Sequence, residues 1–426
     1  MWDFETDPDY QADLDWADQF VRDEVEPLDF VLPLERNDLW HKLVPPLQDE
    51  VRKRGLWATH LGPELGGPGH GQVKLALLNE ILGRATFAPL VFGCQAPDTG
   101  NAEILAHYGS EEHRSRWLQP LLDGTIYSSF SMTEPQAGSD PKEFTCSAVL
   151  QGDEWVINGE KWFSSFARNS DILIVMVVTE PEASPYQRHS MLIVPTDTPG
   201  VTFLRDVGSF GGERGPGVHA YIRYDNVRVP AENLLGGRGQ AFAVSQTRLG
   251  GGRVHHAMRT VGMARQALDL MLERAVSRRT QGELLADKQL VQAMVADSWI
   301  DLEQYRLLVL RTAWRIDRYQ DYKRVRHDIA AVKVALPDVL NRIASRALQI
   351  HGSLGTTDEM PLMEMVARAY QLGLADGPTE IHKLTVGRIL LRQATPAPGL
   401  FPTRHIPALR EAALKKYADV LSSTAG

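Results

Sequence analysis

Nine residues, WVINGEKWF at positions 155–163, place a β-rich region in the middle of an otherwise helical sequence. Asn158-Gly159 stands between two flanks of β-prone residues, a pattern that predicts a β-hairpin with a two-residue turn. Further predicted strands follow as four apolar runs: DILIVMVV, SMLIVP, GVTFL and AYIRYDNVRVP. The sequence therefore predicts a compact β-domain over residues 126–235.

Apolar residues recur at helical spacing on the N-terminal side of this region. GLWATHLGPELGGPGHG (55–71) interrupts the pattern with Gly and Pro, and predicts a long loop. The expected apolar stripes are Leu14, Ala17, Phe20, Val21 and Val25; Leu39, Leu43, Leu47 and Val51; and Val73–Leu82. We expect an N-terminal α-helical domain over residues 1–125.

The helical period returns at residue 236 and continues for most of the remaining chain. Long amphipathic helices of this kind build bundles. Their apolar positions are Val261, Ala264, Leu268, Met271 and Leu272; Leu290, Met294, Trp299, Leu302, Tyr305 and Leu308; and Ala330–Gly352. The expected fold class is α+β, with a C-terminal four-helix bundle over residues 236–393. A Pro-rich extension (394–426) should end in a short helix at Ala408–Leu421.

Composition excludes several classes of protein. A formal net charge of −9 argues against a nucleic-acid partner. Cys94 and Cys146 are the only cysteines, which fits a reducing compartment and offers no metal motif. The N-terminus is acidic and lacks the pattern of a signal peptide. The longest aliphatic run, Ile172–Val178, is far shorter than the roughly 20 residues of a membrane span. We expect a cytoplasmic protein without a metal site or membrane span.

QLGLADGPTEIHKLTVGR, residues 371–388, leaves two interpretations of Asp376 open. Gly377 and Pro378 end the preceding element, and helical spacing then predicts a helix that begins near Thr379. Asp376 could cap this helix, which would stabilise it by about 1 kcal/mol. It could also remove a proton from a substrate. The two roles are compatible.

Four stretches together resemble the acyl-CoA dehydrogenase family: FSMTEPQAGSD (130–140), EKWFSS (160–165), QIHGSLG (349–355) and LADGPTEIHK (374–383). The first stretch is the most specific, because both its amino-acid sequence and its position at the start of the β-domain match. The resemblance extends from the first helices to about residue 392. APDTGNAEILAHYG (96–109) and DGPTEIH look most like the branch that contains the dehydrogenase portion of family members ten and eleven.

The resemblance implies a bound FAD whose isoalloxazine ring touches the β-domain. Residues that face the ring or its reactive edge in the family match Phe130, Met132, Thr133, Phe163 and Ser165 here. Gly138 and Ser139 match positions where the flavin and the CoA thioester meet, so Ser139 is also expected to bind substrate. Hydroxyls and open backbone in this loop suit the polar edge of a planar ring. Phe163 stands where many members have Trp, and its ring can still stack on a flavin.

Other FAD contacts are expected in the C-terminal part. Arg278 matches an arginine that a neighbouring subunit lends to the FAD pyrophosphate, and a guanidinium is well shaped for phosphate oxygens. The remaining expected cofactor residues are Gln281, Gln349, Gly352, Ser353, Pro378 and Glu380, with Gln281 replacing a common phenylalanine. The resemblance thus implies a homodimer or homotetramer with FAD near the subunit interface.

In the family, a glutamate directly followed by Gly is the catalytic base, and Asp376 stands at that place. It would remove the α-proton of an acyl-CoA thioester while the β-hydrogen leaves as hydride to flavin N5. A carboxylate suits this task if the site is dry enough to raise its pKa. Aspartate is shorter by one methylene, about 1.5 Å of reach, which the Gly377-Pro378 backbone would have to make up.

Other members place a glutamate base on the helix that corresponds to LGGGRVHHAM (249–258), where this chain has glycines instead. Arg253 is expected to approach the CoA or the base, whereas His255 and His256 are interpreted as packing or surface residues. Ala375 replaces a frequent tyrosine and predicts a roomier acyl channel. Ala375 and Gly377 are therefore expected to line the substrate site.

The leading hypothesis is an FAD-dependent acyl-CoA dehydrogenase that passes electrons to an electron-transferring flavoprotein. One alternative keeps the fold and changes the chemistry, because nitroalkane oxidases of this superfamily also use an aspartate base and flavin monooxygenases share the fold. Another is a non-catalytic flavoprotein like the DNA-associated alkylation-response relative, against which the charge of −9 argues.

Overall fold

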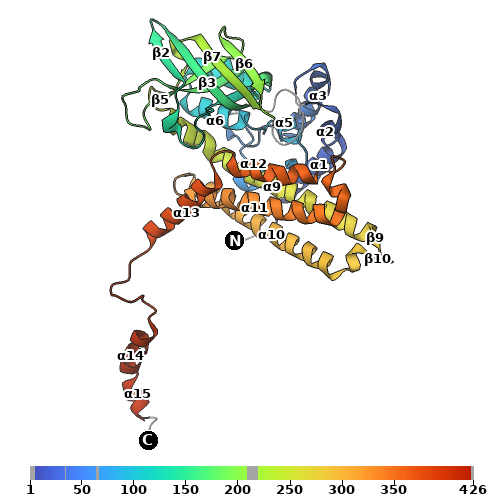
Figure 1. Ribbon diagram of the computed structural model, residues 1–426, viewed down its shortest axis with the longest axis vertical. Coiled ribbons are helices and arrows are strands. Elements are labelled where there is room, and N and C mark those ends of the chain that lie inside the picture. Colours follow the sequence, from blue (N-terminus) through green and yellow to red (C-terminus); the bar gives the residue numbers. More distant parts are fainter. Residues whose placement is uncertain (1–4, 34, 64–66, 209–218, 424–426) are drawn as a thin grey trace. The chain divides into compact units, whose positions relative to one another are not determined.

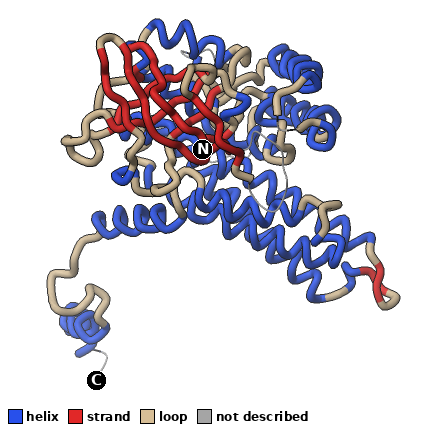
Figure 2. The backbone as a smooth tube through the Cα atoms, turned by 45° about the horizontal axis from the view of Figure 1, so that its top comes forward, coloured by secondary structure: helices blue, strands red, loops and turns tan. Residues whose placement is uncertain are grey.

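The computed structural model describes residues 5–33, 35–63, 67–208 and 219–423. Met1–Lys383 form one compact unit and Leu384–Gly426 a second. Within the first unit, N-terminal helices and a β-sheet lie on one side of a bundle of long helices (Figures 1 and 2). The α+β prediction with a helical N-terminal part, a middle β-domain and a C-terminal four-helix bundle is confirmed.

The N-terminal part is helical up to residue 122. Its elements are α1 (Pro8–Phe20), the π-helical turn η1 (Val21–Val25), α2 (Leu28–Val31), α3 (Asp38–Arg54), α4 (Gly71–Leu82), α5 (Ala88–Val91), α6 (Asp98–Tyr108), α7 (Glu111–His113), the π-helical η3 (Arg114–Leu118) and α8 (Gln119–Leu122). Residues 64–66 of the predicted loop lie outside the described residues. The loop's described parts are irregular, as predicted.

The apolar stripe predicted on α3 begins one residue before the face that the helix buries. The buried face of α3 consists of Trp40, Val44, Gln48 and Val51, while Leu39 is exposed. The Trp40 ring makes edge contacts with Phe87 and Tyr127. A large aromatic ring buries more area than a leucine, so the helix turns Trp40 inward.

The middle part is an eight-stranded sheet in which β1 pairs in parallel with β4, and the other strands follow the order β6-β7-β3-β2-β4-β5-β8. The strands are β1 (Ser128–Ser131), β2 (Ser147–Gln151), β3 (Glu154–Ser165), β4 (Ile172–Val178), β5 (His189–Pro195), β6 (Val201–Asp206), β7 (His219–Pro230) and β8 (Leu234–Leu235). Short 3-10 turns, η4 (Pro141–Glu143), η5 (Ala167–Asn169) and η6 (Ala231–Asn233), connect them.

The hairpin predicted at Asn158-Gly159 was wrong, because β3 runs through both residues as one strand. The pairing of β3 with β7 shifts register between Ile157 and Gly159, so the dipeptide marks a β-bulge. A Cβ on Gly159 would lie 2.6 Å from the Cα of Cys146 on β2. Glycine is therefore required here by the close approach of the neighbouring strand. The turn between β2 and β3 lies at Gly152, whose φ is +65°.

Four long helices form the bundle: α9 (Ala241–Ser277), α10 (Gln289–Tyr319), α11 (Arg326–His351) and α12 (Leu362–Leu374). A small hairpin, β9 (Arg279–Thr280) and β10 (Glu283–Leu284), and the 3-10 turn η7 (Leu285–Asp287) connect α9 to α10, and η8 (Gly352–Thr356) follows α11. Most residues of the apolar stripes predicted for these helices lie in the core of the bundle. Leu272, Leu290 and Trp299 are exposed instead, at 41%, 79% and 56%.

The C-terminal segment begins with α13 (Thr379–Gln393), whose start agrees with the prediction. The predicted terminal helix is two helices, α14 (Ile406–Lys416) and α15 (Ala418–Ser423), separated at Tyr417. None of the helices in the described ranges combines the length and apolar character needed to cross a membrane.

A buried ion pair ties β3 to the loop that follows β1. The Lys161 Nζ donates to Glu134 Oε1 and to the Met132 carbonyl, each at 2.8 Å, and both charged side chains are almost completely buried. Backbone N–H groups of Thr145 and Cys146 donate to the same carboxylate at 2.7 and 3.0 Å. Burial raises the pKa of Glu134, but Lys161 and these donors outweigh it and hold the pKa below its usual value.

We predict that Lys161→Met lowers the free energy of unfolding by about 3–5 kcal/mol, because it leaves the Glu134 carboxylate buried without its cation. The double variant Lys161→Met/Glu134→Leu should regain part of this loss. Denaturant unfolding measures both. Arg22→Ala is the matched control, since its pair with Asp18 is exposed and should contribute less than about 1 kcal/mol. A loss no larger than the control would contradict the prediction.

Candidate active site

Asp376 lies in the short connection between α12 and α13. Its φ of +55° is in the left-handed region, which aspartate tolerates better than most residues, and Gly377 follows with a φ of +104°. The Asp376 carbonyl oxygen accepts a hydrogen bond from Arg253 Nε at 2.9 Å and lies 3.2 Å from His382 Nε2. Arg253 therefore contacts the backbone of Asp376. These contacts hold the backbone in its unusual conformation and set the direction of the side chain.

The Asp376 carboxylate faces α9 rather than the first turn of α13. Its Oδ1 lies 3.7 Å from Arg248 Nη1, and its Oδ2 lies 3.7 Å from His256 Nε2. Gly252 lies between these two residues at intervals of four, on the same face of the helix. A Cβ on Gly252 would lie 2.8 Å from Asp376 Oδ2. The glycine thus makes the space that the carboxylate occupies.

Positive charge keeps this buried carboxylate ionised. Burial alone raises the pKa of Asp376, but His256, Arg248, Arg253 and Lys333 together outweigh it and hold the pKa below its ordinary 3.8. Burial lowers the pKa of His256 to about 4, so its ring is neutral at pH 7 and the two arginines and Lys333 supply the charge there. The raised pKa that the sequence analysis named as a condition for a base is therefore not present in the free protein, and the sequence did not show how many cations converge.

Lys333 approaches the same connection from α11. Its side chain is fully buried, and its Nζ donates to the carbonyl oxygen of Leu372 near the end of α12. Burial lowers the pKa of the Lys333 ammonium to about 8, against the pull of Asp376. The site therefore places a mostly protonated lysine close to an ionised aspartate at neutral pH.

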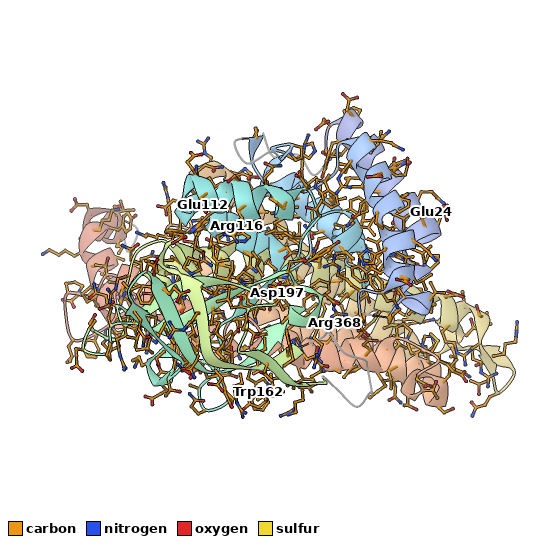
Figure 3. The ribbon with its side chains drawn as sticks, turned by 90° about the horizontal axis from the view of Figure 1, so that it is seen from above. Glu24, Glu112, Arg116, Trp162, Asp197 and Arg368 are labelled. Carbon is orange, nitrogen blue, oxygen red and sulfur yellow. The ribbon has the colours of Figure 1, made fainter. Side chains whose placement is uncertain are left out.

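The expected flavin-facing residues come together on two adjacent segments of the sheet. The backbone N–H of Trp162 donates to the Thr133 carbonyl at 2.8 Å, and Ser129 Oγ donates to the Ser165 carbonyl at 2.7 Å. Phe163 is 45% exposed and is held at a φ of +54°. Trp162, labelled in Figure 3, stacks on Phe163 with ring centroids 5.5 Å apart.

Arg248 connects this surface to Asp376. Its guanidinium lies over the Phe130 ring at 4.2 Å from the centroid, and one of its nitrogens is 3.7 Å from the Asp376 carboxylate. Arg248 Nε also donates to Asn101 Oδ1 of α6 at 3.2 Å. The buried arginine thus joins the β-domain, α6 and the bundle at one point.

The surface fits a planar heteroaromatic cofactor. Phe163 offers an exposed ring, and Ser165 offers a hydroxyl at the end of the same strand, β3. The Nε1 of Trp162 is buried without a hydrogen-bond partner within the described ranges, so a polar group is needed beside it. Gly138 has open space where a side chain would stand, and Ser139 beside it is exposed.

Several predicted cofactor residues lie far from Asp376. Arg278 follows the end of α9, about 39 Å along the helix from Gly252 at 1.5 Å per residue. Gln281 occupies the β9-β10 turn, and Gln349, Gly352 and Ser353 lie exposed where α11 ends. That a neighbouring subunit lends Arg278, Gln349 and Gly352 to the cofactor stays a prediction. Ala375 and Pro378 lie beside Asp376 and Gly377 in the same connection, and Glu380 lies in the first turn of α13.

The sequence analysis did not assign four residues to the site: Arg248, His256, which it interpreted as a packing or surface residue, Lys333 and Glu103. The signal for the first two was present, because Arg248, Gly252 and His256 are spaced by four and share a helix face. Glu103 of α6 lies opposite Gly251, and burial raises its pKa to about 7 while Arg248 opposes this shift. Lys333 carries no local signal, since only the bundle brings α11 to the connection.

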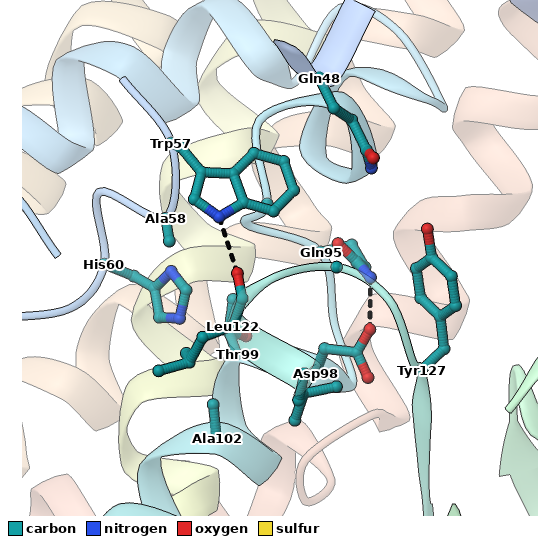
Figure 4. A pocket seen from close by; sticks show the side chains of 13 residues that line it. Gln48, Trp57, Ala58, His60, Gln95, Asp98, Thr99, Ala102, Leu122 and Tyr127 are labelled. Atoms are coloured by element: carbon teal, nitrogen blue, oxygen red, sulfur yellow. Dashed lines mark hydrogen bonds between the residues drawn. The ribbon is translucent and has the colours of Figure 1, made fainter. Parts of the chain in front are cut away.

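A separate cavity lies among the N-terminal helices (Figure 4). Its volume of about 20 Å³ holds roughly one water molecule. Asp98 on its wall receives hydrogen bonds from Gln95 and from the backbone N–H of Ser128, the latter at 2.7 Å. Asp376 is not part of its wall. The cavity wall therefore supports the start of β1, and through it Phe130.

Comparisons with known proteins place this geometry in context. The chain matches the family models of the acyl-CoA dehydrogenase N-terminal domain over residues 7–125, middle domain over 129–227 and C-terminal domain over 238–391. It is 40% identical over 390 residues to probable acyl-CoA dehydrogenase FadE2 of Mycobacterium tuberculosis, covering 91% of this chain and 92% of that protein.

Eukaryotic relatives are longer. Acyl-CoA dehydrogenase family member 11 of Homo sapiens is 42% identical over 362 residues, 83% of this chain and 46% of its own length. Member 10 of Mus musculus is 40% identical over 386 residues, 88% of this chain and 36% of its own length. The chain thus spans between a third and a half of these proteins.

Among solved structures, a putative acyl-CoA dehydrogenase from Mycobacterium abscessus aligns with a TM-score of 0.85 at 38% identity, covering 92% of this chain and all of that one. A glutaryl-CoA dehydrogenase from Mycobacterium smegmatis, solved in complex with FADH2, has a TM-score of 0.77 at 24% identity, covering 92% and 96%. The second likeness concerns the fold alone.

We predict that Lys333 makes stability depend on alkaline pH. Its pKa is lowered from 10.5 to about 8 on folding, so between these values the unfolded chain holds a proton that the folded chain has released. The free energy of unfolding should therefore rise with pH in this window, by at most about 3 kcal/mol. Denaturant unfolding at the two ends of the window should show this rise relative to Lys333→Met.

Lys323→Met is the matched control, because Lys323 is exposed and its removal should leave the wild-type rise in place. Equal pH dependence in the wild type and Lys333→Met would contradict the prediction.

Proposed function

The chain belongs to the acyl-CoA dehydrogenase family of oxidoreductases, and from this membership we propose that it catalyses α,β-dehydrogenation of an acyl-CoA thioester with Asp376 as the base. The observation that carries the proposal is the position of Arg248, which lies between the Phe130 ring and the Asp376 carboxylate. It joins the surface expected to bind FAD to the group expected to take the proton.

Asp376 is suited to accept a proton because it is ionised at neutral pH and partly shielded from water, with 13% of its side chain exposed. Arg253 and His382 hold its backbone, so the carboxylate meets the substrate in one orientation. Its low pKa makes it a weak base in the free protein. A bound thioester that excludes water would raise that pKa toward the value proton transfer needs.

We assign FAD to the surface formed by Phe130, Met132, Thr133, Phe163 and Ser165. Bound FAD supplies the acceptor for the hydride that leaves the substrate β-carbon. The exposed Phe163 ring and the unpartnered Trp162 Nε1 support this assignment, because each is incomplete without a planar polar neighbour. Gly138 and Ser139 would lie at the junction with the CoA thioester, and Ala375 and Gly377 would line the acyl channel.

We further propose a homo-oligomer in which a second copy supplies Arg278, Gln281, Gln349, Gly352 and Ser353 to FAD. Support comes from the position of Arg278, about 39 Å along α9 from Gly252, and from an apolar groove near Arg278, lined by Leu272, Val276, Val295 and Trp299 among others. An electron-transferring flavoprotein is the proposed electron acceptor. Cytoplasmic location stays a prediction from composition.

Anaerobic titration of the FAD-loaded protein with a panel of acyl-CoA thioesters tests the function. The proposed dehydrogenase should lose its flavin absorbance with at least one thioester and regain it slowly in air. Rapid reoxidation with release of peroxide would indicate an oxidase on the same fold. A flavin that no thioester bleaches would contradict enzymatic dehydrogenation.

We predict that Asp376→Asn retains bound FAD but bleaches about 10²–10⁴-fold more slowly, because general-base catalysis contributes a factor of this size. Asparagine keeps the shape of the side chain and removes the proton acceptor. Stopped-flow absorbance under anaerobic conditions measures the rate. A rate equal to that of the wild type would place the base elsewhere.

We predict that Gly252→Ala slows bleaching by about 10²-fold, because its Cβ would displace a carboxylate whose position the reaction requires. The fold should be retained, since alanine is favoured over glycine inside a helix. The matched control is Gly250→Ala, whose Cβ would meet only the Tyr322 ring, at 3.9 Å. If both variants react alike, the contact with Asp376 does not limit the reaction.

A further inference from the structure

Ser165, at the end of β3, has a side-chain partner that the proposed function does not use. In the pairing of β3 with β7, Ser165 lies directly opposite His219. The Ser165 Oγ and the His219 Nδ1 are 2.8 Å apart, a hydrogen bond between two side chains on neighbouring strands. The hydroxyl expected at the reactive edge of the flavin therefore has a fixed neighbour within the protein.

Both ends of this pair are anchored. The Ser165 carbonyl accepts from Ser129 Oγ at 2.7 Å, and the His219 carbonyl accepts from the Val207 N–H at 2.7 Å. Burial lowers the pKa of His219 to about 4, so the ring is neutral at pH 7 and carries one proton on its two nitrogens. A neutral, anchored imidazole can hold a hydroxyl in one direction without adding charge beside it.

The same imidazole contacts Phe163. The two ring centroids are 5.0 Å apart at an interplanar angle of 48°. The pairing with β7 shifts register between Lys161 and Ser164, and this bulge contains Phe163 with its φ of +54°. Bulges beside active sites re-aim side chains. His219 thus touches both β3 residues that were expected to face the flavin.

We propose that His219 is a positioning residue, which holds the Ser165 hydroxyl and the Phe163 ring against the reactive edge of bound FAD. The proposal rests on the proposed function, since it requires FAD on this surface. In the tautomer whose Nδ1–H donates to Oγ, the Ser165 hydroxyl still has its own proton to donate to a third group, and the bond to His219 restricts its rotation. Without His219 the hydroxyl can turn away, and the polar contact to the ring edge is lost or weakened.

The consequence is measurable without any substrate. The edge of the flavin gains hydrogen on reduction, so a hydroxyl held beside it stabilises the oxidised and reduced forms to different extents. Loss of one such neutral hydrogen bond should change the ratio of the dissociation constants of reduced and oxidised FAD by about fivefold. The reduction potential of the bound cofactor reports this ratio.

The test uses the full chain loaded with FAD and titrated with dithionite against a reference dye, together with the visible absorbance spectrum. The variants are His219→Phe, His219→Asn, Ser165→Ala and the double variant Ser165→Ala/His219→Phe. Phenylalanine keeps a ring beside Phe163 and removes the hydrogen-bonding nitrogen. Asparagine keeps a polar atom near the place of Nδ1. The matched control is His189→Phe, a buried histidine of the same sheet in contact with Phe144.

We expect His219→Phe and Ser165→Ala to shift the potential alike, the double variant to shift it no further, and His219→Asn and the control to stay near the wild type. Additive shifts, or a His219→Phe variant with the wild-type potential and spectrum, would overturn the positioning role while leaving FAD binding intact. A wild-type protein that takes up no FAD would overturn the proposed function as well, and its featureless visible spectrum distinguishes that outcome. If the phenylalanine and alanine variants unfold, as thermal melting would show, the reduction potential of His219→Asn alone decides between the outcomes.

Discussion

Cations from separate helices hold the pKa of the largely buried Asp376 carboxylate below its ordinary value. Asp376 loses much of its hydration in the connection between α12 and α13, and desolvation by itself favours the neutral acid. His256, Arg248 and Arg253 of α9 and Lys333 of α11 together outweigh that preference and lower the pKa. The bundle is therefore a requirement of the site's electrostatics, because no local segment of the chain contains all of these charges.

The β-domain contributes the other half of the site through an equally non-local constraint. Lys161 is completely buried and is satisfied by Glu134 and the Met132 carbonyl, so β3 and the loop after β1 have a fixed relative position. Phe130 precedes this clamp and carries the Arg248 guanidinium on its ring. Asp376 and the proposed flavin surface are thus held in register by two cations, Lys161 within the β-domain and the largely buried Arg248 of α9.

Much of the architecture could be predicted from the periodic spacing of apolar residues. The strand runs, the long bundle helices and the start of α13 all follow from this local spacing. The errors arose where a neighbour decides the local structure. Asn158-Gly159 favours a turn in isolation, but the closeness of Cys146 makes the glycine part of a bulge. Leu39 was predicted to be buried, but Trp40 is buried in its place because its ring packs in an aromatic cluster. Lys333 could not be assigned to the site, because its neighbours are far away in the sequence.

The short acid side chain at position 376 and the glycine at position 252 explain one another. Aspartate has about 1.5 Å less reach than glutamate, and a left-handed backbone at Asp376 turns its carboxylate toward α9 rather than along α13. That direction is open only if the facing helix position lacks a Cβ, since one on Gly252 would lie 2.8 Å from Oδ2. A glutamate at 376 would project further into the same space and meet Arg248 or His256. The aspartate and the glycine therefore form a matched pair, and a change at either position should require a change at the other.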